Sequence, residues 1–474
     1  MAPSKTIVCC VIAAVIFISF PDTSILLVSN MTHFATHDLG LAYVLFTSFL
    51  VLVCALLICL PIGKIVIGER SQPEFSFFSW LCMLFAAGMG SGLVFWGVAE
   101  PLSHFAHGPE FAKGIADPQA RVLALTYYNW GIHAWSIYAI AAVVMGWFAF
   151  NKGRSMNVSA SFDANTPGIK GFDIIAVIAI LFGIAGTLSN SIALVETGVG
   201  QLLPEQTLGQ TFRVGILIVV AVGYTLSSVL GLNKGIKYFS AFNISFMILM
   251  LICVMIFSAP LSVLHTVFES VLSYLQLLPH IMFSIDDASK EWTAGWSVTY
   301  FLWWIAWAPF VGPFIARISR GRSIRQIVTC TVLIPTFASI LWFSSFTSGV
   351  FELSNFNELV AATSSDYTQG LFMFFAQMQW GHWLSFAAVL LLVTFVISSV
   401  DSAIYVIAML TATDSLKTKL VWSFILIALA ITLLFKNNPD LNKQIAIVGA
   451  VPFTLILGLQ VLAFIRSVYQ QQAQ

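Results

Sequence analysis

Aromatic side chains cluster in two apolar segments of the sequence, and rings in such numbers could bind a cation. Residues 129–138 read NWGIHAWSIY, and residues 301–309 read FLWWIAWAP. The rings concerned are those of Trp130, Trp135 and Tyr138 in the first segment, and of Trp303, Trp304 and Trp307 in the second. The face of a desolvated ring attracts a quaternary ammonium group by about 2 kcal/mol or more. A box of three or four rings would therefore recognise a methylated cation without carrying a formal charge.

Helical geometry brings members of each cluster together. At about 100° per residue, Trp135 and Tyr138 share a helix face, and Trp130 lies about 80° from Tyr138. In the second segment Trp303 and Trp307 are one turn apart, and Trp304 lies about 100° round the helix from Trp303. The alternative is an aromatic belt at the membrane surface, where tryptophan is commonly enriched. Both clusters lie well inside their apolar segments, which favours the box.

A run of glycines interrupts another apolar segment, at residues 88–101, which read GMGSGLVFWGVAEP. Gly88, Gly90 and Gly92 each cost a helix about 1 kcal/mol relative to alanine. A helix can unwind inside a membrane only where its freed backbone groups meet protein, water or a ligand. The run therefore predicts either a broken helix that binds ligands through its backbone or a close contact between helices.

The composition places these segments in a membrane. Of 474 residues, 59% are hydrophobic and 9% are charged, whereas about 25% charged residues are usual in soluble domains. Apolar runs of about 20 residues, enough to cross a bilayer, recur along the chain. The sequence therefore predicts an all-α polytopic membrane protein in a lipid bilayer. Its zero net charge gives no indication of a nucleic-acid partner.

We predict twelve transmembrane helices and one amphipathic segment. The expected spans are 6–29, 38–63, 74–100, 120–149, 172–200, 211–231, 237–259, 292–317, 325–346, 383–411, 418–435 and 444–467. Apolar residues recur at helical spacing from Leu264 to Leu278, which predicts a helix along the membrane surface. In this topology fifteen Lys and Arg residues lie on the side of the membrane that holds the termini. The other six lie on the opposite side and are Lys113, Arg121, Arg213, Lys290, Lys436 and Lys443. The positive-inside rule then places both termini in the cytoplasm.

The patterns expected of other function classes do not stand out. An enzyme would need a nucleophile with its base, or a metal cluster, and a channel would need a continuous polar pore. No soluble nucleotide-binding domain is expected, so an ATP-driven pump is not predicted. The energy for transport would come from an ion gradient, an exchanged solute or a partner protein.

Three segments resemble the signature motifs of the betaine/choline/carnitine transporter (BCCT) family. They read AAGMGSGLVFWGVAEPL, NWGIHAWSIYA and WWIAWAPFVGPFIARISRGRSIRQ, in the family's order. The resemblance implies a LeuT-like inverted repeat of five plus five helices after two peripheral helices. The corresponding parts of the chain are 1–70 for the peripheral helices, 71–260 for the first repeat, 261–291 for a periplasmic amphipathic helix and loop, and 292–474 for the second repeat.

The resemblance also assigns roles to individual residues. It implies that an aromatic box is formed by Trp130, Trp135, Tyr138 and Trp304. It implies that Trp303 and Trp307 line the adjoining pathway, and that Phe95 is a gating ring. It further implies an unwound third span, in which Gly88, Gly90 and Gly92 free backbone for substrate and ion. Family members commonly form trimers, so a homotrimer in the bacterial inner membrane is expected.

The resemblance favours sodium as the coupling ion, with no other cofactor. In the segment VISSVDSAIY, Ser398 and Ser399 match the place of a hydroxyl pair in sodium-coupled members. The remaining oxygens would be the carbonyls of Ala86 or Ala87 and of Met89. Such a set suits a hard cation, which takes about five or six oxygen ligands. The alternative is that both serines bond only to their own helix.

A zwitterion with a methylated cation fits this chemistry. Glycine betaine or dimethylsulfoniopropionate would place its cation in the box and its carboxylate on amides near Gly90–Gly92. Proton-coupled choline uptake is an alternative, although choline-type members tend to carry aspartate where this chain has Gly92. A sodium-independent exchanger of carnitine-like substrates is another. The expected activity is sodium-coupled uptake of an osmoprotectant by alternating access.

Four further polar residues lie inside the predicted spans. A carboxylate inside a membrane is usually paired or functional. We expect Asp401 to pair with an arginine of the segment ARISRGR, Arg317 in the first place, and to steady the cytoplasmic gate. Glu196 is expected to have an interfacial or capping role. His133 is expected to be a core histidine with satisfied hydrogen bonds, and Thr187 is a hypothetical second sodium ligand.

Overall fold

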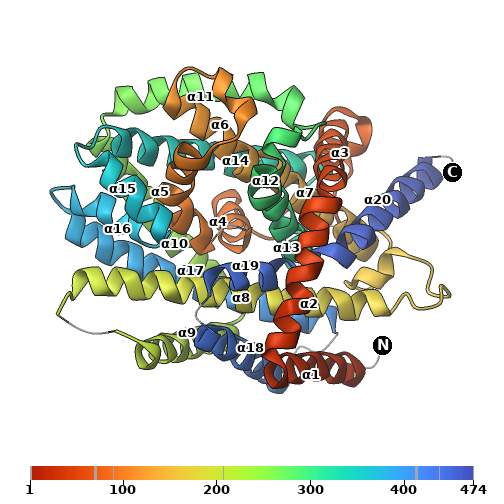
Figure 1. Cartoon of the computed structure of the whole chain (residues 1–474). Helices are drawn as coiled ribbons and strands as arrows, with labels where there is room; N and C mark the ends of the chain where they lie inside the picture. The colour runs from red at the N-terminus through yellow and green to blue at the C-terminus, as the bar shows by residue number, and fades with distance from the viewer. Residues whose placement is uncertain are drawn as a thin grey trace.

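The computed structural model describes residues 3–68, 72–88, 90–205, 208–411, 415–436 and 438–472. Within these ranges the chain is almost entirely helical, and one isolated β-bridge joins Val66 to Ser323. The α-helices, drawn in Figure 1, are α1 Pro3–Ser19, α2 Pro21–His33, α3 Gly40–Cys59, α4 Phe77–Gly88, α5 Gly90–His107, α6 Pro118–Trp130, α7 Ile132–Gly146, α8 Gly171–Leu202, α9 Gln210–Leu230, α10 Lys237–Phe257, α11 Pro260–Ile281, α12 Lys290–Thr293, α13 Thr299–Ile318, α14 Ile324–Phe351, α15 Phe356–Ser365, α16 Gln369–Ala376, α17 Gly381–Leu410, α18 Leu416–Lys436, α19 Pro439–Ile447 and α20 Ala450–Gln472.

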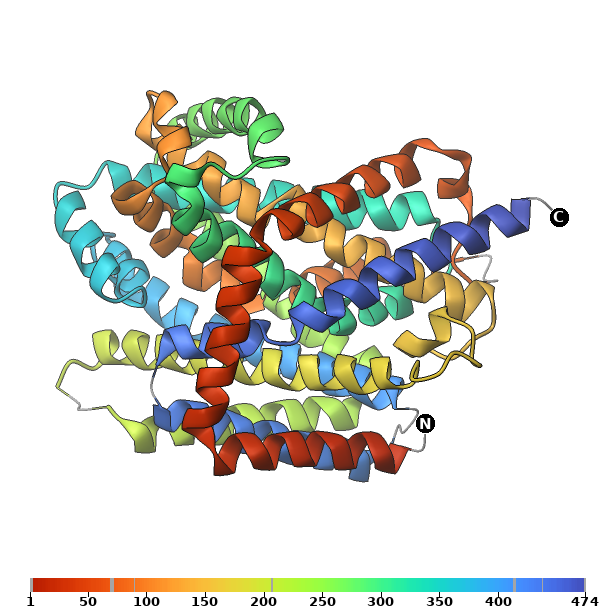
Figure 2. The same ribbon diagram turned by 45° about the vertical axis from the view of Figure 1, so that its right-hand side comes forward.

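The number of membrane spans agrees with the sequence. In the described ranges, eleven helical stretches are long and apolar enough to cross a membrane, and two bent helix pairs bring the total to thirteen. One of the thirteen is α11, the amphipathic segment. It is strongly foreshortened in Figure 2, where α8 and α18 run across the view, so α11 crosses the direction of the bundle. By length and composition the other twelve, with the two bent pairs counted as one span each, correspond to the twelve predicted spans.

The first predicted span, 6–29, is wrong as a single straight helix. α1 and α2 enclose an angle of 107°, and Figures 1 and 2 both show α2 crossing the bundle while α1 runs along it. Phe20 between them has φ −128° and ψ 60°. A proline ring pushes the preceding residue out of the α region, so Pro21 ends one helix and starts the next. Hydropathy alone does not report this bend.

Three spans are interrupted inside the bundle. α4 and α5 enclose an angle of 63° at the glycine run, which is the break that the sequence predicts. Met89, one of the expected carbonyl ligands, falls between them and lies outside the described residues. α6 and α7 are separated by Gly131, with φ −97° and ψ −135°, and α19 and α20 by residues 448–449. The sequence patterns above predict neither of these two breaks.

The spans that carry the aromatic clusters lie deepest in the protein. In Pro118–Asn151 and Asp287–Ile318, 89% of the most apolar stretch is buried, compared with 22% in Gln210–Val229. α7 and α13 pack directly against each other, and Gly312 leaves the room that Ala141 occupies. Most rings of both clusters therefore face protein and not lipid, which argues against a surface belt.

Candidate functional site

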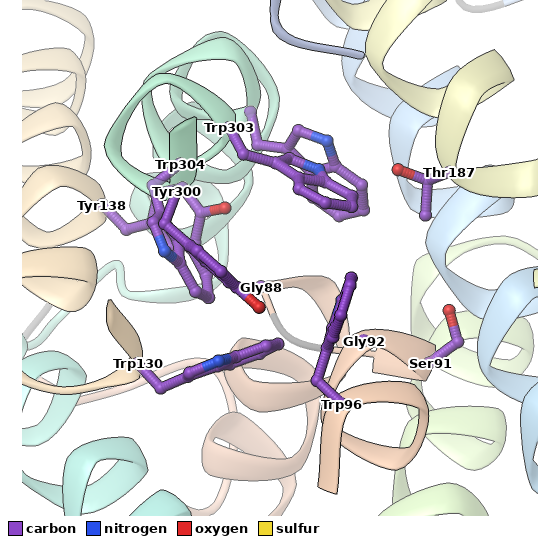
Figure 3. Close-up of a pocket in the computed structure, with 11 residues that line it drawn as sticks. Gly88, Ser91, Gly92, Trp96, Trp130, Tyr138, Thr187, Tyr300, Trp303 and Trp304 are labelled. Carbon is purple, nitrogen blue, oxygen red and sulfur yellow. The ribbon is translucent and has the colours of Figure 1, made fainter. Parts of the chain in front are cut away.

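The two aromatic clusters and the glycine break enclose one cavity inside the bundle (Figure 3). Its volume is about 50 Å³, several times the roughly 10–15 Å³ that a single water needs. The described part of its wall holds no charged side chain. The lining residues are Gly88, Ser91, Gly92, Trp96, Trp130, Tyr138, Thr187, Tyr300, Trp303, Trp304 and Trp307. The arrangement suits a compact organic solute whose cationic part contacts rings.

Trp304 of α13 connects the two clusters. Its ring centroid lies 5.5 Å from that of Trp130 and 5.3 Å from that of Tyr138, both in edge-to-face contacts. Its indole N–H donates to the backbone carbonyl of Asn129 at 3.0 Å. Asn129 lies in the last turn of α6, where carbonyls lack intrahelical donors. The break at Gly131 therefore supplies the acceptor that orients the central indole.

Three of the predicted substrate residues lie outside the cavity wall. Trp135 packs edge-to-face on Tyr138 and 6.1 Å from Trp304, so it supports the box from behind. Phe95, the expected gating ring, packs 4.7 Å from Trp96. Gly90 contributes to the break and not to the wall. The predicted residues that do line the cavity are Trp130, Tyr138, Trp303, Trp304, Trp307, Gly88 and Gly92.

Two further rings line the cavity, although the sequence reasoning assigned neither. Tyr300 lies 5.5 Å from Trp130, and Trp96 lies 6.3 Å from Tyr300. Tyr300 precedes Trp304 by one helical turn, so helical spacing contained the signal for it. Trp96 follows the glycine run, but the angle between α4 and α5 determines where its side chain points.

A fully buried carboxylate holds two of these rings. Glu100 of α5 is 0% exposed; it accepts hydrogen bonds from the indole N–H of Trp130, at 2.6 Å, and from the hydroxyl of Tyr300. The side-chain amide of Asn129 donates to it at 2.8 Å, and Nε2 of His104 lies 3.2 Å away. An indole N–H can only donate, so Glu100 is an acceptor behind the box. The sequence reasoning missed it because the predicted span 74–100 ends at Glu100, whereas α5 continues to His107 and buries the carboxylate inside the bundle.

The glycines of the break serve two different purposes. A Cβ on Gly88 would lie 2.8 Å from the Trp135 ring, and one on Gly92 would lie 3.2 Å from the Trp130 ring. These two glycines let the rings approach the backbone. Gly90 has a φ of +35°, which side-chain-bearing residues rarely adopt. Close packing and a broken backbone, which the sequence left as alternatives, therefore occur together.

One hydroxyl of the expected pair lies directly beside the break. A Cβ on Gly90 would be 2.9 Å from the hydroxyl oxygen of Ser399, and this hydroxyl makes no hydrogen bond to another described residue. The hydroxyl of Ser398 instead donates to the carbonyl of Phe395 at 2.9 Å and accepts from the amide of Asn243 at 3.1 Å. Ser398 thus bonds to its own helix, whereas the oxygen of Ser399 faces the glycine run.

Other oxygens near the cavity have the character that a hard cation prefers. Ala86 and Ala87 lie in the last turn of α4, where carbonyls lack intrahelical donors. Thr187 lines the cavity from α8 and donates to the carbonyl of Gly183 at 3.0 Å. Ala86 and Ala87 thus directly precede the break and Ser399 lies beside it, while Thr187 lies across the cavity from Tyr138 of α7 (Figure 3).

The predicted pair between Asp401 and Arg317 is wrong. Asp401 accepts hydrogen bonds from the adjacent hydroxyls of Ser227 and Ser228 in α9. Arg317 makes a two-pronged ion pair with Glu74, with N–O distances of 2.9 and 3.1 Å. Asp401 faces α9, which packs on α17, and two hydroxyls satisfy its carboxylate there. Glu74 precedes α4 and reaches the end of α13.

Glu196 and His133 contact other residues of the protein and do not line the cavity. Glu196 pairs with Arg213 at 2.5 Å near the end of α8, which agrees with the interfacial role expected of it. His133 is buried against the ring of Phe301, with 5.8 Å between ring centroids. Neither of its ring nitrogens has a hydrogen-bond partner among the described residues. His133 is thus a core histidine, but the expectation of satisfied hydrogen bonds is wrong.

Sequence comparison identifies close relatives of the chain. The model described as the betaine/carnitine/choline family transporter matches residues 2–473. The glycine betaine transporter OpuD of Bacillus subtilis is 34% identical, over 93% of this chain and 89% of its own. A glycine betaine transporter of Acinetobacter baylyi is 32% identical, over 96% of this chain and 71% of its own. An ectoine/hydroxyectoine transporter of Virgibacillus pantothenticus is also 32% identical, over 92% of this chain and 90% of its own.

A solved structure agrees with the predicted architecture. MhsT in complex with L-phenylalanine has a TM-score of 0.50 to this chain at 13% identity, covering 82% of this chain and 90% of its own. At that identity the likeness shows the fold alone, and the fold is the expected LeuT-like one. The relatives are transporters, as expected, and not enzymes. Together with the match over almost the whole sequence, this establishes that the chain belongs to the betaine/carnitine/choline transporter family.

Proposed function

We propose that the chain imports a zwitterion with a methylated cation, glycine betaine in the first place, together with sodium by alternating access. The observation that carries the proposal is an uncharged cavity of aromatic rings next to a broken span. Desolvated rings attract a diffuse cation, and the Glu100 carboxylate, which accepts hydrogen bonds from Trp130 and Tyr300 behind the wall, adds to this attraction. The relatives named as glycine betaine transporters support the same substrate class.

The surroundings of Ser399 support sodium as the coupling ion. Its hydroxyl oxygen faces Gly90, and the last turn of α4 offers the carbonyls of Ala86 and Ala87. Neutral oxygens of this kind suit a hard monovalent cation, and no carboxylate is among them. Thr187 remains our candidate for a second sodium site, because its hydroxyl oxygen lies at the cavity wall.

Two other substrates fit the same chemistry. Dimethylsulfoniopropionate carries a sulfonium in place of the ammonium, and ectoine carries a delocalised cation beside its carboxylate; a relative is named for the latter. Choline and carnitine uptake are the lesser candidates, and Gly92 argues against choline because no acidic side chain stands there to balance its charge.

The proposal includes the setting of the transporter. We infer a bacterial inner membrane with both termini in the cytoplasm, in line with the distribution of Lys and Arg. Residues 71–260 and 292–474 would form the two inverted repeats, with residues 1–70 peripheral and 261–291 at the periplasmic surface. A homotrimer would be the functional assembly.

Replacement of sodium by potassium is expected to abolish uptake of labelled glycine betaine by proteoliposomes that contain the purified protein. The inward sodium gradient would be the only driving force supplied. A competition panel of choline, carnitine, dimethylsulfoniopropionate and ectoine then ranks the substrates. Uptake that persists without sodium and increases when the vesicles are preloaded with solute would identify an exchanger and contradict the proposal.

Ser399→Ala is expected to raise the sodium concentration for half-maximal uptake about tenfold or more, because an interaction with a charged group contributes roughly 1.5–3 kcal/mol. Uptake at saturating sodium would be affected less. The control is Thr394→Val on the same helix, where the hydroxyl bonds only to the carbonyls of its own helix. An unchanged sodium dependence in the Ser399 variant would argue against this site.

A further inference from the structure

A second, larger hollow lies at the surface where α20 ends. Its volume is about 1200 Å³. It is enclosed by the segment 152–170, between α7 and α8, and by the last turns of α20, which lie side by side in both Figure 1 and Figure 2. It shares no lining residue with the aromatic cavity, so the proposed transport site does not account for it.

Positive side chains outnumber negative ones around this hollow. Arg154, Lys170 and Arg466 line it, and Asp163 is the one acidic side chain in the described part of its wall. Arg154 donates to two backbone carbonyls of its own segment. Lys170 and Arg466 are exposed and make no hydrogen bond or ion pair with another described residue. Their charges are therefore available to an anionic ligand.

Buried hydrogen bonds fix the shape of the wall. The carboxylate of Asp173, in the first turn of α8, accepts from the backbone N–H and the hydroxyl of Ser159 at 2.9 and 2.6 Å. Gln460 of α20 is 1% exposed; its amide donates to the carbonyl of Val158 and to the hydroxyl of Ser161, at 3.4 and 3.0 Å. Two membrane helices thus anchor the segment, so the hollow is a preformed part of the fold.

An apolar strip, formed by Leu455, Leu459 and Leu462, leads from the hollow along the outside of α20. These side chains are 73%, 46% and 60% exposed, and the last two also line the hollow. At about 100° per residue they share one face with Arg466. α20 belongs to a candidate membrane span, so this face meets hydrocarbon and the arginine lies at its boundary. A phospholipid has the same order of parts, with acyl chains in the hydrocarbon and a phosphate at its edge.

We propose that this hollow binds the headgroup of an anionic phospholipid from the adjoining leaflet. Lys170 and Arg466 contact the phosphate, and an acyl chain lies along the apolar strip. A guanidinium matches phosphate oxygens in geometry as well as charge. Basic pockets at the cytoplasmic ends of membrane helices take anionic headgroups, and the proposed topology puts this end of α20 on the cytoplasmic side. The bound lipid joins the segment that leads into α8, in the first proposed repeat, to α20 in the second.

The test titrates phosphatidylglycerol and phosphatidylcholine separately into the purified full-length protein in detergent, and native mass spectrometry follows the bound lipid. Wild-type protein is expected to bind phosphatidylglycerol about tenfold or more tightly than phosphatidylcholine. A variant that combines Lys170→Gln and Arg466→Gln should lose this preference, with phosphatidylglycerol binding weakened about tenfold or more, equal to roughly 1.4 kcal/mol. Lys170→Arg with Arg466→Lys should keep the affinity within about threefold.

The matched control combines Lys64→Gln and Lys417→Gln. Both lysines are exposed, lie outside the hollow and are assigned to the same side of the membrane, so this variant loses the same charge elsewhere. It should keep the preference for phosphatidylglycerol. An equal loss in this control would show a general effect of surface charge and would overturn the assignment.

The remaining outcomes also decide the question. Equal binding of the two lipids by the wild-type protein would overturn the assignment, as would unchanged phosphatidylglycerol binding in the variant without Lys170 and Arg466. Glycerol 3-phosphate is a soluble source of the same headgroup chemistry. Its displacement of phosphatidylglycerol at equal concentration would identify a site for a soluble anion and overturn the lipid assignment. None of these results bears on betaine binding in the aromatic cavity, so the assignment is tested separately from the proposed function.

Discussion

Trp304→Ala is expected to weaken glycine betaine binding about 30-fold or more, corresponding to roughly 2 kcal/mol or more from one desolvated ring. The indole lies within 5.5 Å of both Trp130 and Tyr138 and is the ring that joins the two clusters. Its removal deletes one face of the box and also frees its neighbours to move. The measurement is a betaine titration of the purified protein, together with uptake at several substrate concentrations.

Two variants make this result interpretable. Trp304→Phe keeps a ring but loses the N–H that donates to Asn129, so an intermediate affinity is expected. Trp383→Ala serves as the control, because that side chain on α17 is 70% exposed and does not line the cavity. Unchanged betaine affinity in Trp304→Ala would count against the aromatic cavity as the substrate site.

Glu100→Gln is expected to reduce betaine affinity at least tenfold and to lower the thermal stability of the protein. The carboxylate accepts from Trp130, Tyr300 and Asn129, and an amide offers one acceptor oxygen in place of two. At least one buried donor is then left without a partner, at a cost of about 1–3 kcal/mol. Loss of the negative charge also removes a field that favours a cation in the box.

A double-mutant cycle separates the positioning of Trp130 from a general loss of folding. If Glu100 acts by holding that indole, the effect of Glu100→Gln on betaine affinity should shrink when Trp130 is already phenylalanine. The loss of thermal stability should remain in both backgrounds. Glu110→Gln provides the control, since Glu110 is exposed and its side chain pairs with Lys113 at the surface. Fully additive effects on affinity would contradict the positioning role.

The membrane spans were predictable because hydrocarbon imposes a simple requirement of length and apolarity on each helix. The break between Gly88 and Gly90 was predictable for a related reason, since three closely spaced glycines weaken a helix at one point in mid-span. The bend at Pro21 and the break at Gly131 were not. A single proline or glycine is tolerated in many membrane helices, so its effect depends on neighbouring helices that the sequence does not identify.

The candidate site was predictable in its chemistry but not in its details. The two aromatic clusters contain Trp130, Tyr138 and Trp304, and the resemblance to the family selected these rings. The angle of about 80° between Trp130 and Tyr138 assumed one continuous helix, which the break at Gly131 interrupts. The spacing could not place Trp135 behind the wall, since that depends on the contact between Trp135 and Gly88 across two helices. Three hydrogen-bond partners of Glu100 lie on other helices. They depend on tertiary packing, so the sequence alone did not identify them.

The ion pair between Glu74 and Arg317 has a consequence for how tightly transport is controlled. It ties the approach to α4, in the first proposed repeat, to the end of α13 in the second. Under the proposed alternating access, opening at this end would separate these two opposite charges, which are partly shielded from water. If transport is coupled to an ion as proposed, such a latch would discourage the empty carrier from opening, and it would limit a leak of ions that carries no cargo.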